Sequence, residues 1–158
     1  MVLIIPSAVW STMLDAFATE PRWVERVAYL DGVGIAGDGV VVTAVVPDAD
    51  LYPRWYHVSA EAMSAAASHG RSHGLVRLAQ VHTHPGADCR HSDRDDDRAY
   101  SQRDGALSIV LPYHAARRPE LSRALVHART AERWEPLDGD EAAAIVRCIP
   151  SLVDLRRK

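Results

Sequence analysis

Cysteine is scarce in this chain, and that scarcity excludes two kinds of protein. The 158 residues contain only Cys89 and Cys148, which form no C-x-x-C pair. A fold held by several disulfides, or a metal site built from several thiolates, needs more cysteines at closer spacing. The sequence therefore implies neither, and Cys89 is expected to be an ordinary free thiol.

Long apolar runs and an excess of positive charge are also missing. No stretch approaches the roughly 20 apolar residues of a membrane-spanning helix, and the apolar start at residues 1–6 is too short for a secretory signal. The formal net charge is −3 and the sequence pI is about 6.2. Because nucleic-acid binding needs a clustered excess of Lys and Arg, we expect a cytoplasmic protein that binds neither nucleic acid nor membranes.

Apolar residues are sufficient for a core. They make up 47% of the 158 residues, which suits one compact domain over residues 1–158 and is too little chain for two ordinary domains. Alanine and arginine are abundant, whereas lysine is nearly absent. This bias indicates a GC-rich, and hence bacterial, genome.

Local patterns predict an irregular mixture of helices and strands. Helices are expected at residues 7–19, 59–69, 95–102 and 140–148, with N-caps at Ser7 and Ser59 and a helix end at Gly70. Strands are expected at residues 25–35, 40–46, 75–84, 106–111, 122–128 and 132–137. Gly37 and Gly39 mark a hairpin between the first two strands, and residues 47–54 form a turn-rich connection. No β-α-β period appears, so the predicted class is mixed α/β (α+β).

The segment 81–95, V-H-T-H-P-G-A-D-C-R-H-S-D-R-D, carries the clearest chemical signal. His82 and His84 follow an apolar run, and alternation along a strand points both imidazoles to the same face. Pro85 lacks a backbone N–H and suits a strand end. Two imidazoles on one face can share a metal ion.

A serine and an aspartate follow at fixed spacing. Ser92 is a good N-cap, and Asp95, three residues later, completes a pattern similar to a capping box. Helix capping alone explains these two residues. Together with the histidines, however, Asp95 makes three protein ligands, which leaves a tetrahedral zinc with one position open for water.

Together, these residues resemble the signature of a known family. His82-x-His84-Pro85 followed by Ser92-x-x-Asp95 is similar to the signature of the JAMM (JAB/MPN+) zinc metalloproteases. The resemblance implies a JAMM/MPN-like, cytidine deaminase-like fold, in which helices flank a curved mixed sheet. It covers most of the chain, from about residue 7 to about residue 136.

The family also uses an upstream glutamate at the start of a strand. Glu25, followed by R-V-A-Y-L-D-G, matches this context except that Ala28 replaces the usual glycine and Asp31 interrupts the apolar strand. Glu20 is the alternative. A carboxylate outside the metal's ligands can carry the proton of the attacking water to the leaving amine, and we assign this role to Glu25. The resemblance implies that the Ser92 hydroxyl donates to the oxyanion.

The resemblance further implies the substrate. Family members hydrolyse isopeptide or peptide bonds after the C-terminus of ubiquitin-like proteins, and the tail of such a partner can dock by adding a strand at a sheet edge. Similar bacterial proteins accompany E1-like and E2-like enzymes, some in antiphage defence, whereas others process sulfur carriers. The sequence leaves the pathway open.

Two other classes of function stay open. One is a non-catalytic MPN-type scaffold, although such members usually lack the ligands found here. The other is a RadC-like domain linked to DNA repair, although its motif more often has Asn where Thr83 stands, and the charge balance opposes DNA binding.

Several polar and aromatic residues near the motif have two explanations each. His91 is either a loop residue or a residue that tunes the site, and Cys89 lies close enough to be an adventitious ligand. Trp55 and Tyr56 form either a small satellite core or a substrate contact. The aspartates around Asp95 are expected to be a solvated helix start; they are Asp93, Asp96 and Asp97. The histidines with no assigned role are His57, His69, His73, His114 and His127.

Overall fold

The computed structural model describes residues 2–156. The strands are β1 (Leu3–Pro6), β2 (Val27–Ile35), β3 (Asp38–Val45), β4 (Asp50–Tyr52), β5 (Trp55–His57), β6 (Val76–Thr83), β7 (Leu107–Leu111), β8 (Leu125–Arg129), β9 (Trp134–Pro136) and β10 (Val146–Ile149). The α-helices are α1 (Ser7–Phe17), α2 (Ala60–Ser72), α3 (Asp93–Arg98) and α4 (Gly139–Ile145), and the short 3-10 turns are η1 (Tyr113–Ala115) and η2 (Leu121–Arg123).

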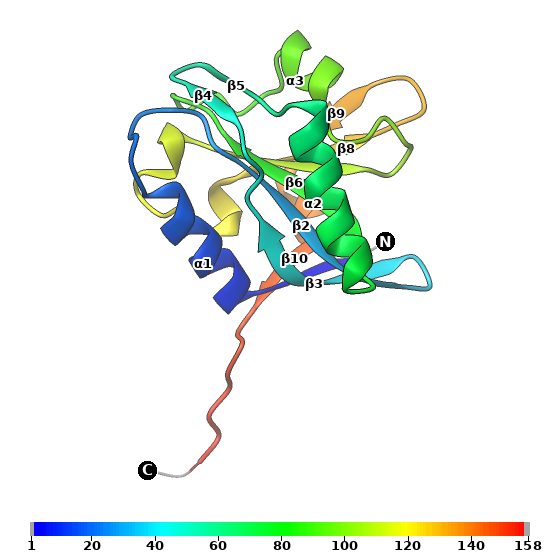
Figure 1. Cartoon of the computed structure of the whole chain (residues 1–158). Coiled ribbons are helices and arrows are strands. Elements are labelled where there is room, and N and C mark those ends of the chain that lie inside the picture. Colours follow the sequence, from blue (N-terminus) through cyan, green and yellow to red (C-terminus); the bar gives the residue numbers. More distant parts are fainter. Residues whose placement is uncertain (1, 157–158) are drawn as a thin grey trace.

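The central feature is a mixed sheet in the order β10-β1-β3-β2-β6-β7-β8-β9. β1 runs parallel to β10 and β3, and β6 runs parallel to β7, whereas the other neighbours are antiparallel. A separate hairpin of β4 and β5 lies near α3 at one end of the molecule (Figure 1). The predicted class, a mixed sheet flanked by helices, is confirmed.

Alternation along β2 divides the interior into two parts. Ala28 and Leu30 belong to the larger apolar cluster, which also contains the buried side chains of α1. Val27 and Tyr29 point to the opposite face and pack with Ala66 of α2. Because successive side chains of a strand alternate, α1 and α2 cover opposite faces of the sheet, on either side of β2.

The predicted hairpin and most predicted strands are confirmed. β2 and β3 pair through Ile35 and Asp38, and Gly37 takes a positive φ of 92° at the turn, which glycine adopts without strain. β8 and β9 pair as expected from residues 122–128 and 132–137. Residues 47–54 were expected to be a turn-rich connection; part of that segment instead forms β4 and the turn into β5.

The two ends of the chain differ from the prediction. Residues 140–148 were expected to be one helix, but α4 ends at Ile145 and β10 follows. β10 pairs in parallel with β1, a strand that the local pattern did not predict. The pairing explains both differences, because the side chains of Val146 and Leu3 become buried only when β10 and β1 lie side by side.

Helix boundaries were wrong in three places. The N-cap of α1 is Pro6, not Ser7, whose hydroxyl instead accepts a hydrogen bond from the backbone of Ser151. α2 continues through Gly70 to Ser72, and Gly74 takes the positive φ. Gly70 is small for a packing reason, since a Cβ there would lie 3.1 Å from the carboxylate of Asp31. The motif helix begins after Ser92, as predicted, but ends at Arg98 and does not continue to Gln102.

The predicted domain of residues 1–158 extends beyond the described residues at both ends and stays a prediction. Along residues 2–156, none of the helices has the length and apolar composition that crossing a membrane requires.

Candidate metal centre

His82 and His84 are fixed at the end of β6. His82 lies between Val27 of β2 and Val110 of β7 and is fully buried. His84 is the second residue after it, where its backbone N–H donates to Leu111 at 2.8 Å and its carbonyl accepts from His114 at 2.7 Å. Strand alternation therefore directs both imidazoles toward one space, as the sequence predicted.

The loop after the strand orients the His84 ring. Its Nδ1 lies 2.9 Å from the carbonyl oxygen of Asp88. A carbonyl can only accept, so Nδ1 carries a proton, and Nε2 offers a lone pair when the imidazole is neutral. Such a backbone contact on the far nitrogen is the usual support of a metal-binding histidine.

The start of α3 supplies the carboxylate. Ser92 is the N-cap, and the predicted capping box is present: its Oγ accepts from the Asp95 N–H at 3.3 Å, and its own N–H donates to Asp95 Oδ2 at 2.7 Å. The capping box holds the Asp95 side chain at the helix start instead of letting it extend into solvent. Helix capping and presentation of the carboxylate are therefore one arrangement.

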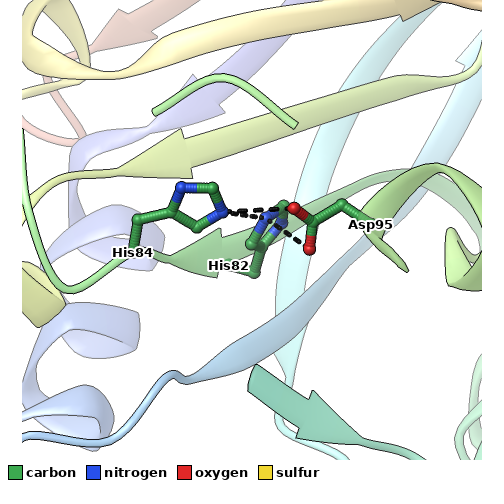
Figure 2. A group of neighbouring side chains, drawn as sticks. All are labelled: His82, His84 and Asp95. Carbon is green, nitrogen blue, oxygen red and sulfur yellow. Dashed lines mark hydrogen bonds and ion pairs between the residues drawn. The ribbon is translucent and has the colours of Figure 1, made fainter. Parts of the chain in front are cut away.

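The three candidate ligands meet at spacings that suit a small metal ion (Figure 2). His82 Nε2 and His84 Nε2 are 3.3 Å apart. Asp95 places Oδ1 3.5 Å from His82 Nε2 and Oδ2 3.3 Å from His84 Nε2. Ligands about 2.0–2.1 Å from a tetrahedral zinc lie about 3.3–3.4 Å from one another. This group of side chains could therefore hold a metal ion without large movement.

The protonation states of His82 and Asp95 suit metal binding, whereas a proton on His84 would compete with the metal. Burial lowers the pKa of His82 to about 3, so this imidazole is neutral at neutral pH. Burial raises the pKa of Asp95, but hydrogen bonds from His84 and Ser92 and the nearby His82 outweigh it and hold the pKa well below its usual range. For His84, burial lowers the pKa, but the contacts with Asp95 and the Asp88 carbonyl leave it raised. Neutral imidazole and ionised carboxylate are the forms that bind metal.

Glu25 lies beside this group. It precedes β2 by two residues. The Thr83 N–H donates to the Arg26 carbonyl at 3.0 Å and the Arg26 N–H donates to the Thr83 Oγ1 at 2.8 Å, which continues the antiparallel register and brings Glu25 next to His84. Its N–H donates to the Tyr52 carbonyl at 2.8 Å, and only 4% of the residue is exposed. Burial raises its pKa to about 7, against the opposing effect of His84.

Glu20, the alternative glutamate, lies elsewhere. Its side chain is exposed and pairs with Arg22 at 3.0 Å. It is not among the residues that line the cavity at the candidate metal centre, whereas Glu25 is. Of the two glutamates, Glu25 is therefore the one placed for chemistry.

The Ser92 hydroxyl is already engaged. Its Oγ lies 2.7 Å from Asp95 Oδ2, and a carboxylate oxygen can only accept, so the hydroxyl proton points at Asp95. Ser92 borders the same cavity. Its predicted contact with an oxyanion requires this proton to turn away from Asp95.

A second polar cluster, which the sequence did not indicate, supports α3 from behind. His91 places Nδ1 2.8 Å from Asp96 Oδ1 and Nε2 2.9 Å from Ser108 Oγ on β7. His127 stacks on the His91 ring at 3.9 Å, and its Nε2 accepts from the His91 backbone N–H. Ser108 is fully buried. This arrangement resembles a catalytic triad in connectivity, but its serine is fully buried, and the cluster connects the segment that carries Asp95 to β7.

Other residues near the motif are now placed. Cys89 is buried, burial raises the pKa of its thiol to about 11, and it is not part of the His-His-Asp group. Asp93 and Asp97 are exposed, as expected for a solvated helix start, whereas Asp96 contacts His91. The spacing of His127 from the motif gave no signal of its contact with His91.

The cavity over the centre measures about 490 Å³. Trp55 and Tyr56 of β5 line it, and the Tyr56 ring lies 5.7 Å from that of His82. Its charged lining consists of Glu25, Asp88 and Asp95 and the arginines Arg54, Arg90, Arg94 and Arg98. Tyr56 also packs against the second apolar cluster, as the satellite-core explanation expects, whereas a contact of this aromatic pair with substrate stays a prediction.

No family model matches the chain. Among solved structures, protein DSY2949 from Desulfitobacterium hafniense is similar with a TM-score of 0.72 and 16% identity, over 96% of this chain and 95% of that chain. A JAB1/MPN domain protein, AF2198 from Archaeoglobus fulgidus, aligns with a TM-score of 0.47 and 18% identity, over 85% of this chain and 94% of that chain. The first likeness shows a shared fold, and the second is too distant to carry an argument.

Proposed function

We propose that this chain is a zinc-dependent peptidase of the JAMM type, which hydrolyses an isopeptide or peptide bond after the C-terminus of a ubiquitin-like protein. The observation that carries the proposal is the His82, His84 and Asp95 group, which offers one ligand atom from each residue, all within 4.8 Å of one another. A buried glutamate in the same cavity supplies the second element that such hydrolysis needs.

When bound, a zinc ion supplies Lewis acidity: it polarises a carbonyl and lowers the pKa of water from about 15.7 toward about 7. His82 and His84 would hold it through Nε2, and Asp95 through a carboxylate oxygen. Three protein donors would leave a tetrahedral zinc with one position for water.

Glu25 moves the proton. A general base works best when its pKa lies near the working pH, and burial brings the pKa of Glu25 to about 7. Its carboxylate takes a proton from the attacking water as the oxygen adds to the carbonyl carbon. The same proton then passes to the leaving nitrogen, the C–N bond breaks, and the products are a carboxylic acid and an amine.

Ser92 stabilises the oxygen that becomes negative. Its hydroxyl, now donated to Asp95, would turn to the oxyanion once the carboxylate of Asp95 is occupied by the metal. Loss of one such donor typically costs roughly 10²–10³ in rate. The partner's extended C-terminal tail would enter along the cavity beside β5.

The biological setting is proposed from the same resemblance. The substrate would be a ubiquitin-like protein of the same bacterium, used with E1-like and E2-like enzymes in conjugation or antiphage defence, or as a sulfur carrier. The site we describe is compatible with a cytoplasmic enzyme of this kind.

The first prediction tests cleavage. Purified protein loaded with zinc is mixed with fusions whose N-terminal parts are a panel of bacterial ubiquitin-like proteins, including any encoded beside its gene, and products are identified by mass spectrometry. We expect one cut after the ubiquitin-like C-terminus, and a loss of at least about a hundredfold in rate for Glu25→Gln.

Glu20→Gln is the matched control, because it removes the same charge from the exposed alternative glutamate and should cleave at the wild-type rate. If zinc-loaded wild type leaves every fusion intact, the proposal fails. If cleavage occurs but is equally fast in Glu25→Gln, the assigned proton route is wrong.

A further inference from the structure

Three arginines on the rim of the cavity lack carboxylate partners. Arg54 lies in the turn between β4 and β5, and Arg94 and Arg98 lie one turn apart on α3, so the two elements face each other across the cavity. Among residues 2–156, no ion pair includes any of the three. Arg90, a fourth arginine on this rim, is already paired with Asp88 at 2.7 Å.

Two of the unpaired arginines are held by partners that do not balance their charge. The Arg94 guanidinium stands over the Trp55 ring, 4.6 Å from its centroid, and Trp55 stacks on Tyr52. Arg98 Nη1 lies 3.3 Å from the imidazole of His57. Both partners belong to β5. Contacts of this kind fix a guanidinium in place, and its outer N–H groups stay available to an anion.

These positive charges lie close to the candidate metal centre, because Arg54 and Arg94 line the same cavity as the carboxylate of Glu25. Of the three acidic residues in the lining, Asp88 pairs with Arg90, Asp95 belongs to the candidate metal group, and Glu25 is only 4% exposed. The part of the cavity that a ligand would touch therefore carries excess positive charge, although the whole chain has a net charge of −3.

We infer that this cavity selects an acidic peptide segment, with Asp or Glu side chains within a few residues of the bond to be cleaved. Guanidinium groups bind carboxylates through paired N–H donors, and a positive rim also speeds the encounter with a negative partner. A basic tail would be repelled at the same place. The inference rests on the proposed function and narrows its substrate class.

A nucleic acid is disfavoured as the occupant. Its phosphate backbone needs a long basic track, whereas the unpaired arginines surround a single cavity of about 490 Å³. Asp93 and Asp97 are exposed on α3 itself, beside Arg94 and Arg98. A backbone extending along this helix would meet negative charge, whereas a short peptide ends within the cavity.

The second prediction is tested by calorimetry with the zinc-loaded Glu25→Gln protein, which binds without turnover. The probes are N-acetylated peptides that end in Gly-Gly and carry glutamate, glutamine or lysine at the preceding positions. We expect the glutamate peptide to bind at least about tenfold more tightly than the glutamine peptide, and the lysine peptide to bind more weakly than both. Added salt should reduce the difference.

Substitution of the arginines tests whether they cause the preference for the glutamate peptide. The double variant Arg94→Glu with Arg98→Glu should reverse the order of affinity for the three peptides. Arg54→Gln, in an exposed turn where misfolding is not expected, should weaken the binding of the glutamate peptide about three- to tenfold. Arg147→Glu is the matched control, because this exposed residue of β10 lies outside the cavity lining and should change nothing. Circular dichroism checks that each variant is folded.

Equal affinity for the three peptides overturns the inference, and so does tighter binding of a single-stranded oligodeoxynucleotide than of the glutamate peptide. The two proposals fail separately. Cleavage of fusions without a charge preference contradicts only the acidic-segment inference, whereas a charge preference without any cleavage contradicts only the peptidase proposal.

Discussion

At the scale of single residues, the buried carboxyl of Glu25 has the largest consequence. It is 4% exposed and faces Asp95, yet no ion pair within residues 2–156 includes it. A charged group in such a place destabilises the fold. Burial at this position therefore lowers the stability of the fold and also gives Glu25 a pKa that suits proton transfer, a combination found at catalytic sites.

The third prediction follows from that pKa. The folded pKa of about 7 lies above the ordinary glutamate pKa of 4.5, so the folded state holds the proton more tightly than the unfolded state does. The stability that this proton contributes is complete below about pH 4.5 and is lost as the pH rises through about 7. In metal-free protein, Glu25→Gln should therefore be more stable than wild type by about 1–3 kcal/mol at pH 8, with little difference at pH 4.

Urea unfolding in the presence of a chelator measures this difference at each pH. Glu20→Gln serves for comparison, because its exposed side chain should give no difference that depends on pH. A Glu25→Gln variant that is less stable than wild type at pH 8 would show that the carboxylate is stabilised by its surroundings and is not an adjusted base.

At the scale of elements, the start of α3 depends on β7. Asp96 on α3 contacts His91, and His91 contacts Ser108 of β7, whose hydroxyl also lies 3.3 Å from Gln80 Nε2 of β6. This connection ties the helix start to the two strands beneath it. Contacts of this kind usually decide how well a metal site is pre-formed.

The fourth prediction is that Ser108→Ala lowers zinc affinity about tenfold, because the His91 segment loses its fixed point on the sheet and Asp95 moves with it. Zinc titration with a competing chromophoric chelator measures the affinity. Ser64→Ala on the exposed surface of α2 is the control. Loss of stability with unchanged zinc affinity would mean that the His91 cluster only packs the interior.

Sequence could reveal what depends on near neighbours. Alternation placed His82 and His84 on one face, and three-residue spacing predicted the capping box that holds Asp95. Contacts between distant residues were not predicted. His127 stacks on His91, which lies 36 residues earlier in the chain. Arg54 and Arg94 line the same cavity only because the fold places the β4–β5 hairpin near α3 (Figure 1). Gly70 appeared to end a helix, but its small size serves the contact with Asp31.

At the scale of the whole molecule, one sheet contains the first strand, the last strand and the strand that leads to the candidate metal centre. β1 and β10 form one end of the strand order, and β6, whose end carries His82 and His84, lies in its other half. The local pattern at residues 140–148 favoured a helix because the partner of β10 is more than 130 residues away. Much of the sheet thus depends on pairing between strands that lie far apart in the sequence, which short motifs do not predict.

The fifth prediction is that metal occupancy stabilises the entire fold. Zinc joined to His82, His84 and Asp95 links β6 to α3, and an ion that binds only the folded state adds RT ln(1 + [L]/Kd), about 4 kcal/mol at a thousandfold excess over Kd. For a chain of this size, we expect chelation to lower Tm by roughly 8–16 °C, and zinc to restore it.

Asp95→Asn should abolish the zinc-dependent shift, because a neutral amide is a poor zinc ligand, whereas Asp97→Asn, two residues along α3 and exposed, should keep it. A wild-type Tm that is the same with zinc and with chelator would contradict the assignment of these residues as a metal centre.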